Sequence, residues 1–293
     1  MLKFIQKITL LVILLCTPIF GKTILFDIHG VLLYENISGA VKKKVMHKLT
    51  AAQQEKASRG LRDADEYKKY CALCEEYNIV AHLPAFHYPD CCHLPRETYA
   101  LFAGLITPDD LYERTKKMLA QAAIDEKFKS HMEQLIITAM IETVFEREQL
   151  LDAVTPLAEG QSLIEHFATE SEHDVAVFSN APQEWVDVYL AHEPFKNVFD
   201  HVEKNNVLTS GGLQKLKPDA PAFEAACEAL GCAPEDVILI DDTLGNVEGA
   251  RAFGMEAVYF DHTEIERVVD ELKELGVCNE ENAPRLHRLM RTQ

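Results

Sequence analysis

The chain has 293 residues, of which 47% are hydrophobic, and its formal net charge is -18 at pH 7. This length allows one large domain or two ordinary ones with a substantial core. The acidic balance argues against binding nucleic acid or an anionic membrane surface, since both need clustered Lys and Arg.

Residues 1–21 differ from the rest of the chain. Lys3 and Lys7 precede an apolar run over residues 8–20, which is short for a membrane span. This pattern is typical of a secretory signal peptide. We therefore expect an exported or membrane-anchored protein, with any membrane association confined to residues 8–20. An uncleaved anchor and an extra buried helix of a cytoplasmic protein are the alternatives.

The first strand is predicted at residues 23–27, and the next clear strand comes only at 174–178. Between them, about 40–155, the sequence carries helical patterns such as those over residues 111–119 and 132–150. An insertion this long inside one strand-to-strand crossover should form a domain of its own.

The predicted insertion contains a group of cysteines and histidines. Its members are Cys71, Cys74, Cys91, Cys92, His82, His87 and His93. Four of them could bind zinc, but the finger-like spacing of the first cysteine pair is not repeated. A disulfide or packed thiols is the interpretation we favour.

From Gly160 onward, helices and strands are predicted to alternate. We expect helices at about 161–170, 182–192, 218–230, 246–253 and 263–275, and strands at 174–178, near 198–202, 237–241 and 257–260. Alternation of this kind predicts an α/β fold with a doubly wound parallel sheet.

Polar residues follow three of the predicted strands, at the point where each apolar run stops. They are Asp27, the pair Ser179-Asn180 and the pair Asp241-Asp242, and Lys217 lies between the second and third groups in sequence. The carboxyl ends of parallel strands meet at one edge of a sheet, where such folds bind ligands. Carboxylates suit Mg²⁺, and hydroxyl, amide and ammonium groups suit phosphate. The sequence therefore predicts a phosphate-handling magnesium site.

The order carboxylate, hydroxyl plus amide, lysine and carboxylate pair resembles the four motifs of the haloacid dehalogenase (HAD) superfamily. The segment 241–255 also resembles the "DDxxxN" form of its fourth motif. The resemblance implies a Rossmann-like core of residues 22–35 and 156–277 with the catalytic strand in the middle of the sheet. It further implies a helical C1-type cap over 36–155 and a tail over 278–293.

The resemblance also implies roles for individual residues. Asp27 would be the nucleophile that forms an aspartyl-phosphate, and it would also bind Mg²⁺. Asp242 would be the principal carboxylate ligand of the ion, and Asp241 would either assist it or hold a coordinated water. Lys217 would lie near both Asp27 and the phosphate.

Ser179 and the backbone amide of Asn180 or Ala181 would hold the phosphate oxygens. His29 occupies the place where most phosphatases of the family carry a second Asp. The backbone carbonyl at this place binds Mg²⁺ in the family, so His29 counts among the predicted metal ligands. Its imidazole could protonate a leaving oxygen and later activate water. Nearby Mg²⁺ and Lys217 should favour its neutral form.

We therefore expect a Mg²⁺-dependent phosphatase that acts on a small phosphate ester. A catalytically weak protein that binds ligands through the phosphate site is the alternative, and His29 is its main support. A dehalogenase is a further alternative, although the pair Asp241-Asp242 would be superfluous there.

Overall fold

The computed structural model describes residues 21–48, 96–128 and 130–278. Its main feature is a five-stranded parallel sheet with strand order β5-β4-β1-β6-β7. The strands are β1 (Thr23–Phe26), β4 (Asp174–Ser179), β5 (Val207–Thr209), β6 (Val237–Asp241) and β7 (Glu256–Tyr259). The prediction of a doubly wound parallel sheet with the first strand in its middle is confirmed.

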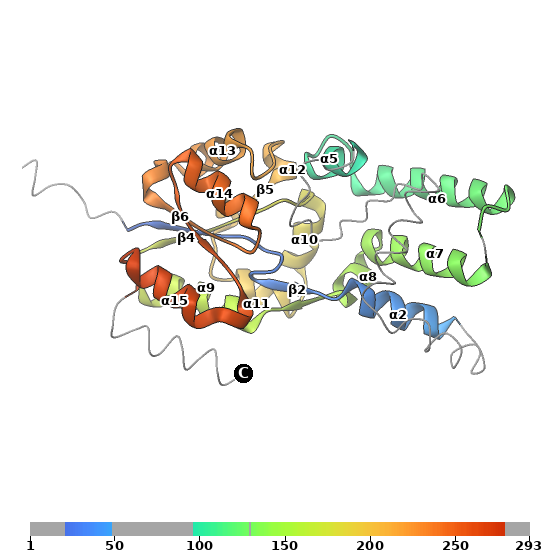
Figure 1. Ribbon diagram of the computed structural model, residues 1–293, viewed down its shortest axis with the longest axis horizontal. Coiled ribbons are helices and arrows are strands. Elements are labelled where there is room, and N and C mark those ends of the chain that lie inside the picture. Colours follow the sequence, from blue (N-terminus) through green and yellow to red (C-terminus); the bar gives the residue numbers. More distant parts are fainter. Residues whose placement is uncertain (1–20, 49–95, 129, 279–293) are drawn as a thin grey trace, which may run out of the picture.

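Helices cover both faces of the sheet (Figure 1). One face carries α9 (Ala158–Glu170), α10 (Gln183–Ala191), α11 (Phe195–Phe199) and α15 (Ile265–Glu274), and the other carries α13 (Ala220–Leu230) and α14 (Leu244–Phe253). Side chains of β1 alternate between the two cores: Ile24 and Phe26 join the first, and Leu25 joins the second. Burial on both faces explains why the middle of each strand is apolar without alternation.

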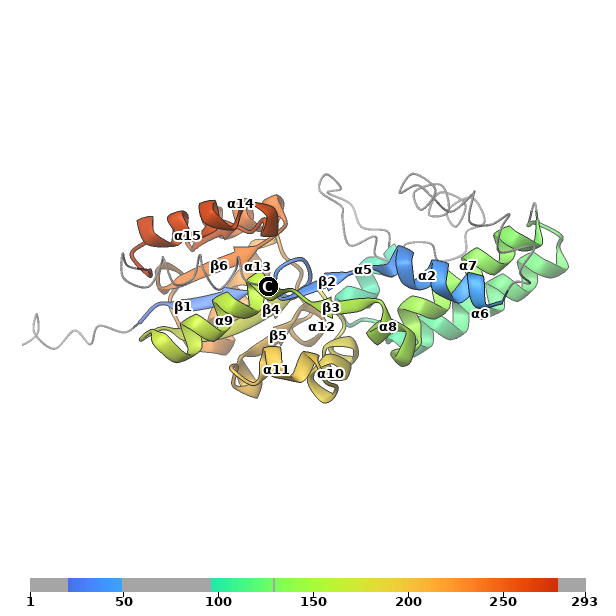
Figure 2. The same cartoon turned by 90° about the horizontal axis from the view of Figure 1, so that it is seen from below.

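A short antiparallel ribbon of β2 (Leu33–Glu35) and β3 (Val154–Pro156) leads from the sheet to a group of helices beside it (Figures 1 and 2). We call these helices the helical insertion. They are α2 (Ile37–His47), α5 (Arg96–Phe102), α6 (Pro108–Ile124), α7 (His131–Phe145) and α8 (Arg147–Asp152). Both α2 and α6 pack against α7.

Side-chain caps fix the starts of the two long helices of the insertion. Thr107 Oγ1 accepts a hydrogen bond from the Asp110 backbone N–H, and Ser130 Oγ accepts one from the N–H of Glu133. Each cap satisfies a backbone donor that has no partner inside the helix. The helical pattern over 132–150 forms two helices, because Glu146 has extended backbone angles between α7 and α8.

One predicted strand is wrong. The residues near 198–202 do not pair in the sheet: α11 covers Phe195–Phe199, and the edge strand is β5, Val207–Thr209. Phe195, Val198 and Phe199 are buried together. Their spacing of three and four residues is the helical one, and it places all three on one face.

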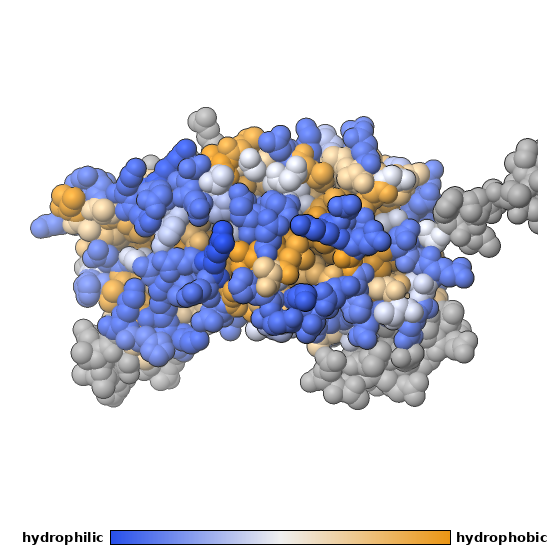
Figure 3. Space-filling model, turned by 180° about the vertical axis from the view of Figure 1, so that it is seen from behind, coloured by the Kyte–Doolittle hydropathy of each residue, from blue (hydrophilic) through white to orange (hydrophobic). Residues whose placement is uncertain are grey.

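The surface seen from behind Figure 1 is mostly hydrophilic, and hydrophobic residues gather in its middle (Figure 3). Among the described residues, no helix has the length and apolar character needed to cross a membrane. Residues 1–20 of the predicted leader, which spans residues 1–21, and the cysteine and histidine group of residues 71–93 lie outside the described residues.

Candidate active site

The site lies at the carboxyl edge of the sheet, where three neighbouring strands end in polar residues. Asp27 follows β1 directly, Ser179 is the last residue of β4, and Asp241 is the last residue of β6. The backbone N–H of Asp27 continues the strand pairing by donating to the Ile240 carbonyl at 2.9 Å. Because β4, β1 and β6 are adjacent and parallel, residues far apart in sequence meet here.

Lys217 connects the ends of all three strands. Its Nζ donates hydrogen bonds to Asp27 Oδ1 at 3.1 Å, to Asp241 Oδ2 at 2.6 Å and to the Phe178 carbonyl at 2.7 Å. Lys217 is only 3% exposed. Burial lowers its pKa, but Asp241 and Asp27 outweigh burial and hold the pKa above its ordinary value. The ammonium therefore stays charged and fixes the direction of the Asp27 carboxylate.

Asn180 holds the backbone of Lys217 in place. Its Oδ1 accepts from the Lys217 N–H at 2.9 Å, and its Nδ2 donates to the Lys217 carbonyl at 2.8 Å. The side chain of Asn180 thus locks the lysine loop onto the end of β4. This positioning role of the side chain was not predicted, because the sequence places the two residues 37 positions apart.

Asp241 and Asp242 complete a cluster of three carboxylates with Asp27. One ligand oxygen from each of the three lies within 4.8 Å of the others. Asp241 also accepts from the Thr243 backbone N–H at 2.9 Å and from Asn246 Nδ2 at 3.0 and 3.1 Å. The "DDxxxN" spacing is thereby explained, since the Asn lies in the first turn of α14 and reaches back to the first Asp.

The charges of this cluster do not balance. Burial, and then the charges of Asp27 and Asp241, raise the pKa of Asp242 to about 8. Burial and Asp27 also raise the pKa of Asp241, although Lys217 opposes them. Three carboxylates around one ammonium favour a bound cation, and an all-oxygen donor set suits Mg²⁺. The residues present therefore fit the predicted metal.

Gly30 allows the loop after β1 to lie against this cluster. Its φ is +78°, and a Cβ at this position would come within 2.0 Å of Asp242 Oδ2. Any side chain here would be strained and would displace the second Asp of the pair.

His29 lies on the other side of the site and is 8% exposed. Its Nδ1 is 3.4 Å from Ser179 Oγ, and its Nε2 is 3.3 Å from both Tyr189 Oη and Glu35 Oε1. Burial, and then the charge of Lys217, lower the pKa of His29 to about 3. The imidazole is therefore neutral, as predicted, but burial is the larger cause and was not foreseen.

Two residues that contact His29 were not identified as site residues from the sequence. Glu35 is two positions after buried Leu33 in β2, and this spacing places both on one face of a strand. Tyr189 is four positions after buried Trp185 in α10, hence on the same face of that helix. Both signals are present in the sequence, but neither identifies the site without the three-dimensional arrangement.

The predicted site residues of the four motifs all lie at this edge of the sheet: Asp27, His29, Ser179, Asn180, Lys217, Asp241 and Asp242. A central strand that ends in Asp, beside a lysine and an Asp pair on neighbouring segments, defines a Rossmann-like α/β enzyme. The family model of haloacid dehalogenase-like hydrolases matches residues 22–254. The chain belongs to this family of hydrolases.

Two curated relatives have different activities in their names. One is the (S)-2-haloacid dehalogenase of Pseudomonas sp. (strain YL), 27% identical over 89 residues, which are 30% of this chain and 36% of the relative. The other is phosphatase MT3486 of Mycobacterium tuberculosis (strain CDC 1551 / Oshkosh), 40% identical over 72 residues, which are 24% of this chain and 33% of the relative. The chain thus matches about a third of the length of each.

Two solved structures are among those similar to this chain. A HAD family enzyme from Bacteroides thetaiotaomicron, in complex with magnesium and inorganic phosphate, is 18% identical with a TM-score of 0.49, over 82% of this chain and 94% of that chain. The L-2-haloacid dehalogenase from Xanthobacter autotrophicus with chloropropionic acid covalently bound is 15% identical with a TM-score of 0.44, over 91% of this chain and 88% of that chain.

Proposed function

We propose that this hydrolase is a Mg²⁺-dependent phosphatase that cleaves a small phosphate ester through an aspartyl-phosphate on Asp27. The observation that carries the proposal is the contact of Lys217 with both Asp27 and Asp241, inside a cluster of three carboxylates. Phosphoryl transfer depends mainly on positioning and on neutralising negative charge, and these groups supply both.

In the first step, Asp27, Lys217 and Ser179 have separate roles. A carboxylate oxygen of Asp27 attacks phosphorus, the ester bond breaks, and the leaving oxygen departs with the bonding pair. Lys217 orients Asp27 and offers a positive charge to the phosphate oxygens. Ser179, buried at the end of β4, offers its hydroxyl to the same phosphate oxygens.

The second step returns Asp27 to its starting state. Water attacks phosphorus, the bond to the Asp27 oxygen breaks, and a water proton passes to neutral His29. His29 then releases this proton to solvent, which balances the proton that the departed oxygen takes up from solvent. Asp27, Asp241 and Asp242 would hold Mg²⁺, and the ion would neutralise charge on the transferred phosphoryl group.

The dehalogenase alternative is disfavoured by the second Asp of the pair. Attack on a carbon-halogen bond needs an Asp nucleophile but no divalent cation. Asp242 would then be a half-buried carboxylate that Asp27 and Asp241 repel, with no cation to balance it. The phosphatase relative and the Asp pair together support the proposed reaction class.

Two assays on the full chain test the proposal. We expect hydrolysis of an aryl phosphate that requires added Mg²⁺ and stops with a chelator, and no halide release from a 2-haloacid. Metal-independent halide release would make the protein a dehalogenase. Binding of inorganic phosphate without turnover of either compound would favour the weak or inactive binding protein.

A further inference from the structure

Glu35 has an unusual place for a carboxyl group. It is the last residue of β2 and pairs with Val154 of β3 in the ribbon that leads to the helical insertion. The next residue, Asn36, already caps α2 by accepting from the Gly39 N–H. The Glu35 side chain is nevertheless only 10% exposed, because it turns from the ribbon toward His29.

The His29 ring is contacted at both of its nitrogens. Glu35 Oε1 and Tyr189 Oη each lie 3.3 Å from Nε2, whereas Ser179 Oγ lies 3.4 Å from Nδ1. Nδ1 therefore faces the strand end that offers phosphate ligands, and Nε2 faces away from it. Glu35 Oε1 is buried, and its contact with Nε2 does not have the geometry of a hydrogen bond in this structure. Contacts of this kind are often loose before substrate binds.

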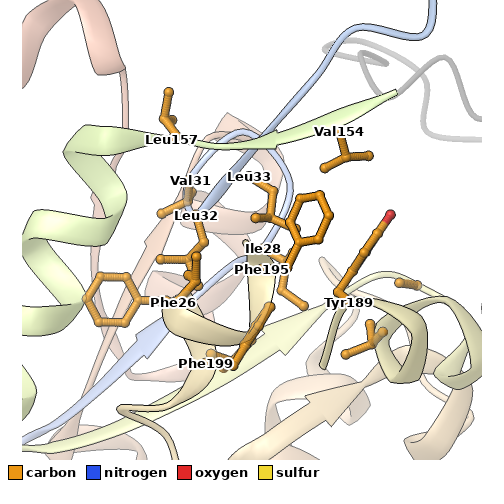
Figure 4. Close-up of a cluster of buried hydrophobic side chains, with 14 of the residues drawn as sticks. Phe26, Ile28, Val31, Leu32, Leu33, Val154, Leu157, Tyr189, Phe195 and Phe199 are labelled. Atoms are coloured by element: carbon orange, nitrogen blue, oxygen red, sulfur yellow. The ribbon is translucent and has the colours of Figure 1, made fainter. Parts of the chain in front are cut away.

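Tyr189 provides a rigid wall beside the ring. It is completely buried and packs with Phe195 and the apolar residues that follow β1 (Figure 4). Its ring meets that of His29 edge to face, with centroids 5.8 Å apart. The imidazole therefore has little freedom to tilt beside this wall.

We propose that Glu35 is a positioning residue: it accepts a hydrogen bond from Nε2–H of His29, so that the lone pair of Nδ1 faces the phosphate-binding end of β4. A carboxyl oxygen can accept this bond in either ionisation state, and a tyrosine hydroxyl can accept as well as donate. Such partners fix the tautomer of a histidine and the orientation of its ring.

The inference rests on the proposed function for its catalytic consequence, since Nδ1 would be the atom that takes the proton from water. It also gives the ribbon a role beyond connection. Glu35 belongs to β2, so the base is held by the strand that carries the helical insertion.

The test uses the full chain with ¹⁵N-labelled histidine and four variants: Glu35→Leu, Glu35→Gln, the control Glu228→Gln on the exposed face of α13, and His29→Gln to assign the signals. We expect wild type to show one His29 tautomer with the proton on Nε2. Glu35→Leu should give a mixture of tautomers, whereas Glu35→Gln, which keeps an acceptor oxygen, should retain the wild-type signals.

Turnover of an aryl phosphate with Mg²⁺ supplies the second readout. Glu35→Leu should lower kcat by about 10-fold to 100-fold with little change in KM, the range typical of losing a hydrogen-bond partner that orients a metal-bound histidine. Glu35→Gln should retain most of the wild-type kcat. Unchanged imidazole signals in a folded Glu35→Leu protein would overturn the inference. An inactive wild type would count against the proposed phosphatase instead, because the imidazole signals report on Glu35 without turnover.

Discussion

The site has a charged side around Lys217 and a neutral side around His29. Around Lys217, charged groups are buried in direct contact: its ammonium bonds to Asp27 and Asp241, and all three are nearly inaccessible. Around His29, the ring is neutral, with a pKa of about 3, and burial also raises the pKa of its neighbours Glu35 and Tyr189 well above their ordinary values.

This difference separates two tasks. The charged side holds the nucleophile and the carboxylates that suit a cation, so any loss there should remove the reaction altogether. The neutral side handles only a proton, and water can partly replace a proton acceptor. Substitutions on the two sides should therefore differ in size and in the property that they change.

The largest expected effect belongs to the nucleophile. Asp27→Asn should lower kcat for an aryl phosphate by at least about 10⁴-fold, since a neutral amide cannot form the acyl-phosphate bond. Steady-state kinetics measures this, with Asp174→Asn at the exposed start of β4 as the control. An Asp27→Asn protein with more than a tenth of wild-type turnover would place the nucleophile elsewhere.

Lys217 should matter for stability as well as for turnover. Lys217→Met leaves Asp27 and Asp241 buried without their cation, and breaking a buried ion pair in this way costs about 3–5 kcal/mol. Urea denaturation of the metal-free protein should show this loss. Exposed Lys215→Met, two residues away, should change the free energy of unfolding by less than about 0.5 kcal/mol. Equal effects of the two variants would contradict the assigned contacts of Lys217.

His29 should affect the rate without affecting the metal. His29→Gln removes a proton acceptor, so we expect kcat to fall by about 10²-fold. Its side chain is not one of the three clustered carboxylates, so Mg²⁺ affinity measured by calorimetry should stay within about twofold of wild type. Exposed His131→Gln is the matched control. A large loss of Mg²⁺ affinity in His29→Gln would contradict the separation of metal binding from proton transfer.

A further expected effect concerns stability alone: a pH dependence of the free energy of unfolding in the metal-free protein. The pKa of Asp242 is raised from 3.8 to about 8, chiefly by burial. Between these values the folded state keeps a proton that the unfolded state has lost. The free energy of unfolding should therefore fall as pH rises from 4 to 8.

Asp242→Asn removes this titration, so urea denaturation in the presence of a chelator should show a shallower fall with pH than in wild type. Asp241 and Glu35 also make the free energy of unfolding fall with pH, in wild type and in Asp242→Asn, since their pKa values are raised too. Identical slopes for wild type and Asp242→Asn would show that Asp242 is not repelled as described.

The sequence predicts the charged side of the site well and the neutral side poorly. Asp27, Ser179 and Asp241 end apolar runs of strand length, and a parallel sheet must bring such ends together. Glu35 and Tyr189 come from a connecting ribbon and a helix, whose approach to His29 depends on packing that periodicity does not encode.

The errors in the fold have the same origin. The short strand expected near 198–202 covers the end of helix α11 and the turn after it, and α11 packs against α9, α10 and β3. So few apolar residues are too short a pattern to exclude a strand from sequence alone. The true edge strand, β5, has three residues, which is too few for a recognisable pattern. Long elements in the core, such as β4 and α9, were predicted to within a few residues.

The central claim is that Asp27 takes the phosphoryl group, and it can be tested by trapping the intermediate. Wild-type protein would be mixed with an aryl phosphate and Mg²⁺, quenched in acid during turnover, digested and analysed by mass spectrometry. We predict that the peptide containing Asp27 gains the mass of one phosphoryl group and that Asp27→Asn shows no such gain. Turnover with the phosphoryl group on another residue, or on none while Asp27→Asn remains active, would contradict the account.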